Sequence, residues 1–146
     1  TDAYSAARLG VARTSNARLE SFDHKIYARM TNTFFEPGTK RKDDLLCSIR
    51  DGLYLHYAGG GMEDPKGWGI QIQGVVAERV IGGKLTGELF YEAGLTGYLP
   101  DLLANIKGVS REFEMPGTGR CGKGHHDWVR VAEGGPYLLI KDVVLS

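Results

Sequence analysis

Glycine is the feature that most limits the folds open to this chain. Its 146 residues include 21 glycines, which are scattered along the sequence rather than gathered in a repeat. Because glycine has no Cβ, it suits turns, bulges and places where one backbone closely approaches another. So many scattered glycines predict a chain that is rich in β-structure.

The composition narrows the classes of partner. Lys plus Arg and Asp plus Glu both number 18, so the net charge is zero and no global field attracts nucleic acid or an anionic membrane. No apolar run approaches the roughly 20 residues that span a bilayer. We therefore expect neither nucleic acid nor membrane as a partner. Because the chain starts at Thr1 and not at Met, we expect it to be a segment of a longer protein.

Two cysteines are too few for a disulfide scaffold in a chain of this size, which favours the reducing cytoplasm. Cys47 falls in a segment that is predicted to be helical, KRKDDLLCSIRDG, where apolar residues recur at helical spacing. This helix is expected over about 41–51, with Gly52 just beyond its end. Cysteine in such a place is ordinarily a small buried hydrophobe. A second helix is expected in DLLANIK, between Pro100 and Gly108.

The remaining segments read mostly as strands. We expect strands over 26–35, in LYLHYA, WGIQIQGVVAERVIGG and LTGELFYEAGL, and later in VSREFEM, WVRVA and YLLIKDVVLS. The glycines at 59–61 are interpreted as a flexible loop, and residues 82–84 as the tip of a hairpin. The total is about seven strands and two short helices without a βαβ rhythm. We therefore predict a mainly β (α+β) fold, a twisted antiparallel sheet or partly closed barrel, in one domain over 1–146 whose residues 1–24 form an arm.

The segment MPGTGRCGKGHH at 115–126 holds most of the unusual residues of the second half of the chain. Glycines near Cys121 let the backbone come close to a ligand, and Arg120 and Lys123 would favour the thiolate. A thiolate binds metal or acts as a nucleophile. This segment is the candidate site.

Three interpretations of this segment stay open. A phosphate-binding loop fits G-x-x-x-x-G-K, but Gly124 stands where Ser or Thr should bind magnesium, and a strand is expected to follow instead of a helix. A zinc site could use Cys121 with His125 or His126, but adjacent histidines in a strand point to opposite faces, so His24, His56 or residues outside the chain would have to help. The third interpretation is a Gly-rich turn without a ligand.

Two motifs, ARMTNTFFEPG at 28–38 and GTGRCGKG at 117–124, resemble the TldD/PmbA family. The features around them follow the same order as in that family: SAARLGVARTSNARLESF, then DGLYLHYAGGG, and finally GGPYLLIKDVVL. The resemblance therefore covers nearly the whole chain in collinear order.

The resemblance implies a mostly antiparallel β C-terminal domain of a cytoplasmic peptidase, in a family that is also labelled as a modulator of DNA gyrase. Its TldD-type subunit holds zinc, pairs with a PmbA-type subunit and hydrolyses unfolded or extended peptides. The zinc ligands are two histidines of an H-E-x-x-x-H helix and the cysteine of a C-G-K loop, which Cys121 matches. The helix precedes the matched region and belongs to the missing N-terminal part, so this chain should carry no catalytic residue and be inactive alone.

Substrate contacts are expected from the polar residues Arg29, Asn32 and Thr33, with Gly60 and Gly61 as a further place where an extended peptide adds to a strand edge. The other interpretation is that Asn32 and Thr33 satisfy backbone groups at the end of a strand. For the whole chain, the alternative function is a non-catalytic module that binds peptide or a partner protein without metal.

Overall fold

The computed structural model describes residues 1–14, 16–64, 66–117, 119–123 and 127–145. Its contacts divide the chain into two compact units. Unit 1 comprises Thr1–Glu36 and Phe113–Gly135, and unit 2 comprises Pro37–Glu112 and Pro136–Ser146. Each unit is described by itself. The expectation of one domain over 1–146 with an arm at 1–24 stays a prediction.

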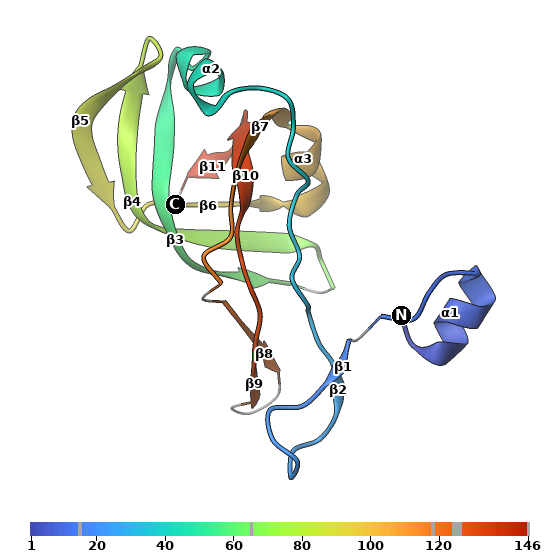
Figure 1. The fold of residues 1–146 in the computed structure, drawn as a ribbon. Helices are drawn as coiled ribbons and strands as arrows, with labels where there is room; N and C mark the ends of the chain where they lie inside the picture. Colours follow the sequence, from blue (N-terminus) through green and yellow to red (C-terminus); the bar gives the residue numbers. More distant parts are fainter. Residues whose placement is uncertain (15, 65, 118, 124–126, 146) are drawn as a thin grey trace. The chain divides into compact units, whose positions relative to one another are not determined.

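Unit 1 is built from one helix and two small pairs of strands (Figure 1). Its elements are α1 (Ala3–Leu9), β1 (Ala17–Arg18), β2 (Tyr27–Ala28), β8 (Arg120–Lys123) and β9 (Asp127–Arg130). Strand β1 pairs with β2, and β8 pairs with β9, both antiparallel. The buried apolar side chains of this unit are few: Ala6, Val129 and Val131.

Helix α1 lies within residues 1–24, which were predicted as an arm, and local chemistry explains its ends. The Asp2 side chain accepts a hydrogen bond of 2.7 Å from the Ser5 N–H, which caps the helix. Gly10 ends it in the left-handed conformation, with φ of 66°, and donates its N–H to the Ala6 carbonyl. These two residues set the length of the helix.

Unit 2 holds the larger sheet (Figure 1). Its strands are β3 (Asp51–Glu63), β4 (Gly69–Ile81), β5 (Lys84–Tyr91), β6 (Gly94–Tyr98), β7 (Ile106–Glu114), β10 (Gly135–Ile140) and β11 (Val144–Leu145), with helices α2 (Lys42–Cys47) and α3 (Leu99–Ala104). The two ends of β7 and β10 that adjoin unit 1 belong to that unit. Five strands form one sheet in the order β11-β6-β4-β3, with β5 also paired to β4, and β7 pairs with β10. The buried apolar residues are Leu45, Ala77, Val80, Leu95 and Leu102.

These elements confirm the predicted mainly β fold. All the strand pairs of the five-stranded sheet are antiparallel. In the part of the chain that the structure describes, the strands form open sheets rather than a closed barrel, and the helices number three instead of two.

The predicted hairpin tip at 82–84 is confirmed at its first two residues. Ile81 lies opposite Lys84, so Gly82 and Gly83 make a two-residue turn between β4 and β5. Both have positive φ, 56° and 78°, which glycine adopts without strain. A Cβ on Gly83 would also lie 2.7 Å from the Cα of Cys47, so this position has no room for a side chain.

Both predicted helices are shorter than expected. Helix α2 ends at Cys47 instead of about 51, because the carbonyls of Ile49 and Arg50 accept hydrogen bonds from the glycine turn at 82–83. Gly52 accordingly lies in β3 and does not end the helix. Helix α3 ends at Ala104, and the residues after Asn105 start β7. Cys47 is exposed, so its prediction as a buried hydrophobe is wrong.

Two strand predictions also need correction. The glycines at 59–61 do not form a loop but lie within β3, which pairs with β4 through several shifts of register. Such β-bulges accommodate glycine, which explains the mistake. The strand predicted over 26–35 is reduced to Tyr27–Ala28, because later residues of that segment use their side chains to bind backbone elsewhere in unit 1. Across the described residues, none of the helices is long and apolar enough to span a membrane.

Candidate functional site

Cys121 lies on strand β8 of the hairpin β8–β9, directly opposite Val129. Its thiol is free and the residue is partly exposed. Residues 127–130 form a strand, so the helix that a phosphate-binding loop requires does not follow at that point. His125 and His126, which one zinc interpretation used, lie outside the described residues.

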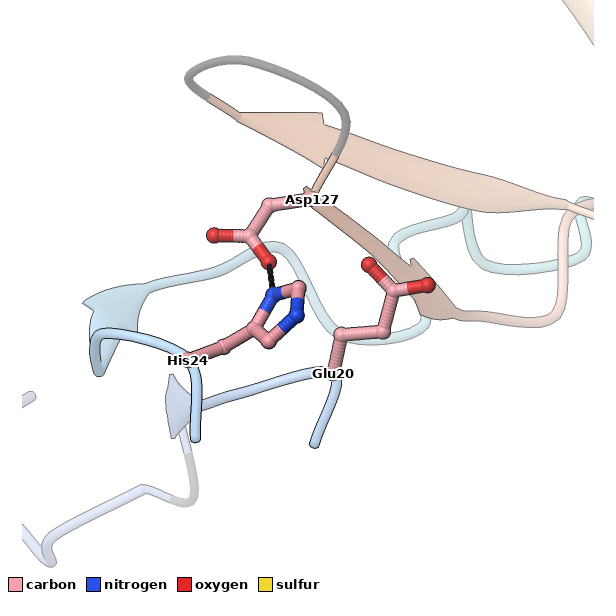
Figure 2. Close-up of side chains that lie close together, drawn as sticks. All are labelled: Glu20, His24 and Asp127. Carbon is pink, nitrogen blue, oxygen red and sulfur yellow. Dashed lines mark hydrogen bonds and ion pairs between the residues drawn. The ribbon is translucent and has the colours of Figure 1, made fainter. Parts of the chain in front are cut away.

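A second group of ligand-type side chains lies beside the same hairpin. Figure 2 shows His24 and Glu20, from the segment between β1 and β2, directed toward Asp127 at the start of β9. Their ligand atoms all lie within 4.8 Å of one another. His24 Nδ1 is hydrogen-bonded to Asp127 Oδ1, and Glu20 Oε2 accepts a hydrogen bond of 2.7 Å from the Trp128 N–H.

The electrostatics of this group favour a tie between segments over a cation site. The hydrogen bond to Asp127 raises the pKa of His24, and the nearby carboxylates raise it further, so the imidazole is stabilised in its charged form. The Arg29 guanidinium lies 3.7 Å from Asp127 Oδ2. The Arg29 guanidinium, and the imidazole of His24 whenever it is protonated, would repel a metal ion added at Asp127.

The outer edge of β9 is covered by side chains of residues 18–32. Val131 donates its N–H to the Gly119 carbonyl, so the backbone N–H and C=O groups of the odd-numbered residues point toward β8. The backbone N–H and C=O groups of the even-numbered residues point away from β8 and form hydrogen bonds with other partners. The Arg130 carbonyl accepts from Arg18 at 2.8 Å, the Trp128 N–H bonds Glu20, and the Ala132 N–H bonds Asn32 Oδ1 at 2.8 Å. This edge is therefore not free to pair with another strand.

Arg29 approaches the hairpin from another side. Its side chain is fully buried, and Nη1 donates to the carbonyls of Cys121 at 3.0 Å and Asp127 at 3.1 Å. One guanidinium thus holds both β8 and β9. Nearby, Lys123 Nζ donates to the Ala28 carbonyl at 3.0 Å.

The predicted site residues separate between the two units. Cys121, Arg29, Asn32 and Thr33 lie in unit 1, and Gly60 and Gly61 lie in β3 of unit 2. Thr33 is exposed, and its hydroxyl donates to the Thr31 carbonyl at 3.3 Å. Metal binding by Cys121 and substrate contacts by the others stay predictions.

Glu20 and Asp127 were missed by the sequence analysis, and His24 appeared there only as a helper for zinc. The two residues of each of these contacts lie about a hundred positions apart in the sequence. For His24 and Asp127 the separation is 103. No periodicity or short motif marks such pairs.

Whether zinc fits this site depends on which side chains are suitable ligands for it. A free, partly exposed thiol is a suitable zinc ligand, so Cys121 fits as one ligand of the set. In the described residues, the one group of three or more metal-ligating side chains is Glu20, His24 and Asp127, which does not include Cys121. Among the described residues, Cys121 is therefore a candidate sulfur ligand that stands outside this group.

This chain is similar in sequence to a family model and to several known proteins. The model of the PmbA/TldA metallopeptidase C-terminal domain matches residues 1–146. A metalloprotease of Methanothermobacter thermautotrophicus is 33% identical over 141 residues, covering 97% of this chain and 30% of that protein. A protein named zinc metalloprotease TldD homolog, from Saccharolobus solfataricus, is 32% identical over 143 residues, covering 97% of this chain and 31% of that protein.

The fold agrees with a solved structure. TldE from Thermococcus kodakarensis superposes with a TM-score of 0.68 at 17% identity, over 99% of this chain and 30% of that one. At this identity the likeness concerns the fold alone. The chain spans about 30% of the length of the relatives it matches. On the full-length match of the domain model, this chain belongs to the family of PmbA/TldA metallopeptidase C-terminal domains.

Proposed function

We propose that this chain is the C-terminal domain of a TldD-type zinc metallopeptidase, in which Cys121 is a zinc ligand. The observation that carries the proposal is the free, partly exposed thiol of Cys121 on β8, within a chain that matches the domain model from end to end. The name of the Saccharolobus relative supports zinc as the metal. The family resemblance supplies the remaining ligands and the general base from an H-E-x-x-x-H helix outside this chain.

Within that enzyme, the role of this chain is to complete the metal site. The Cys121 thiolate would contribute one charged sulfur ligand, which is a soft donor that zinc binds well. Bound zinc supplies Lewis-acid activation of a carbonyl and of a water molecule. Because no catalytic acid or base is assigned to this chain, we expect it to be inactive alone.

For the substrate, we propose an extended or unfolded peptide. Among the described strands, β3, which has 13 residues, pairs only with β4, so no described strand is paired to its other edge. An extended peptide binds such an edge through main-chain hydrogen bonds. Gly60 and Gly61 lie in this strand and are exposed, which suits close approach of a peptide backbone. Thr33, exposed in unit 1, is a further proposed contact.

The proposed partners are the missing N-terminal region of the same chain and a PmbA-type subunit, and the proposed compartment is the cytoplasm. The retained cysteine of the C-G-K motif favours the TldD-type side of the pair. The second candidate is a non-catalytic module that binds peptide or protein through the β3 edge without metal, which the open edge alone would support.

The test uses the product of the whole gene, with and without a PmbA-type subunit. Hydrolysis of an unfolded polypeptide is compared with hydrolysis of the same protein when folded, for the natural protein and for Cys121→Ser. The proposal expects cleavage of the unfolded substrate by the natural protein and loss of cleavage in Cys121→Ser. Binding of the unfolded polypeptide without cleavage by either protein would favour the second candidate.

A further inference from the structure

Arg29 is the one arginine with a fully buried side chain among the described residues. Its backbone is fixed on both sides by Asn16: the Arg29 N–H donates to the Asn16 carbonyl at 2.7 Å, and Asn16 Nδ2 donates to the Arg29 carbonyl at 2.9 Å. The start of the side chain is therefore held in place before its guanidinium reaches any partner.

The guanidinium ends at the Cys121 hairpin. Nη1 donates to the carbonyls of Cys121 and Asp127, at 3.0 and 3.1 Å, and Nη2 lies 3.7 Å from Asp127 Oδ2. The guanidinium carbon also lies over the ring of Tyr27, 5.6 Å from its centroid. A planar group with donors in a fixed fork can hold two carbonyls at once, which the single ammonium of lysine does less well.

This burial has an energetic cost. Nε and Nη2 are buried and have no hydrogen-bond partner among the described residues. An unpaired buried donor is unfavourable, and a charged one more so. The contacts to Cys121 and Asp127, together with the Tyr27 ring, compensate this cost, so the position of this arginine depends in part on the hairpin.

We propose that Arg29 is a positioning residue for the thiol of Cys121, acting through the Cys121 carbonyl, and not a residue that contacts substrate. Fixing the carbonyl fixes the orientation of the backbone from which the thiol projects. Residues that orient metal ligands in this way commonly change metal affinity by about 10- to 100-fold when they are replaced. The part of this proposal that concerns zinc rests on the proposed function, in which Cys121 binds the metal.

The first experiment replaces zinc with Co²⁺ in the whole gene product, because a thiolate bound to Co²⁺ gives a near-ultraviolet charge-transfer band. The variants are Arg29→Ala, Arg29→Lys and Cys121→Ser. Arg18→Ala is the matched control, since it removes an arginine that bonds the Arg130 carbonyl of the same hairpin at 2.8 Å without touching Cys121.

We expect the band in the natural protein and in Arg18→Ala, none in Cys121→Ser, a strong loss in Arg29→Ala and a partial loss in Arg29→Lys. Resistance of the bound metal to a chelator should fall about 10- to 100-fold in Arg29→Ala. An undiminished band and unchanged resistance in Arg29→Ala would overturn the proposal. Equal losses in Arg29→Ala and Arg18→Ala would also overturn it, because they would indicate general stabilisation of the hairpin.

The second experiment separates this inference from the proposed function. In metal-free protein, the alkylation rate of the peptide that carries Cys121 is followed by mass spectrometry, with exposed Cys47 of unit 2 as the internal control. We expect a several-fold change at Cys121 in Arg29→Ala and none at Cys47. An unchanged rate at Cys121 would overturn positioning of the thiol. If the natural protein shows no charge-transfer band, the proposed function fails, while a changed alkylation rate still supports Arg29 as the residue that positions the thiol.

Discussion

The two units of this chain differ in the interactions that stabilise each of them internally. Unit 2 has long paired strands, with 13 residues each in β3 and β4, and buried apolar side chains on its helices and sheet. Unit 1 has strands of two to four residues and three buried apolar side chains, and its segments are joined by single polar contacts to backbone groups. The candidate metal ligand lies in the unit that depends on individual polar side chains.

Single substitutions should therefore have different effects in the two units. When one contact in a sheet is lost, many neighbouring contacts remain. Loss of one partner of a buried charge, by contrast, leaves a specific group unpaired. The predictions below compare the two units in the whole gene product by peptide-resolved hydrogen exchange, which measures the local free energy of opening.

The largest effect is expected from Asp127→Asn in unit 1. This change removes the carboxylate beside the buried Arg29 guanidinium and should lower the local stability of β8 and β9 by about 4 kcal/mol. Asp23→Asn is the matched control, since Asp23 is exposed and lies 3.9 Å from His24; its effect should stay within about 0.5 kcal/mol. Equal effects of the two changes would contradict the importance of the buried pair.

The next effect is expected from Leu45→Ala in unit 2. Leu45 is buried on α2, and its truncation should destabilise that unit by about 3 kcal/mol through lost burial and a cavity. Leu103→Ala on α3 serves as control, because Leu103 is 45% exposed and should change stability by about 0.5 kcal/mol or less. If faster exchange after Leu45→Ala were confined to unit 1, the division into two units would be wrong.

Leu45 and Asp127 also show how much of the structure could be predicted from the sequence. Leu45 belongs to an apolar pattern of helical spacing, and the glycines at 82–83 form a recognisable turn, so both features were predicted from local sequence. Asp127 and Arg29 have no such pattern, because each is defined by a partner about a hundred residues away. Arg29 was therefore predicted as a substrate contact, although its side chain is buried.

The same limit applies to the glycines at 59–61. Their composition is typical of a loop, and only the pairing of β3 with β4 reveals them as part of a bulged strand. The candidate ligand Cys121 was found because a short motif marks it, whereas Arg29 was named only as a substrate contact and its bond to the hairpin was not predicted.

A smaller effect is expected from Asn32→Ala. This variant loses the oxygen that accepts the Ala132 N–H at 2.8 Å and should lower the stability of unit 1 by about 1 kcal/mol. The neighbouring Thr33→Ala, whose hydroxyl is exposed, should have almost no effect on exchange. If Asn32→Ala reduced peptide affinity while exchange stayed unchanged, Asn32 would be a substrate contact rather than a cap of the β9 edge.

The smallest effect concerns pH. The folded-state pKa of His24 is raised by its hydrogen bond to Asp127, so the charged imidazole stabilises unit 1 fully below the ordinary pKa of about 6.5. This contribution is lost as the pH rises through the raised value. The difference in local stability between the natural protein and His24→Gln should therefore shrink as the pH rises. A difference that grows with pH would show that the sign is wrong.

Binding of zinc by Cys121 can be measured as the zinc content of the purified whole gene product. The natural protein is compared with Cys121→Ser and with Cys47→Ser, whose exposed thiol lies on α2. The account predicts about one zinc ion per chain in the natural protein and in Cys47→Ser, with loss of zinc in Cys121→Ser alone. Full zinc content in Cys121→Ser, or none in any of the three proteins, would contradict it.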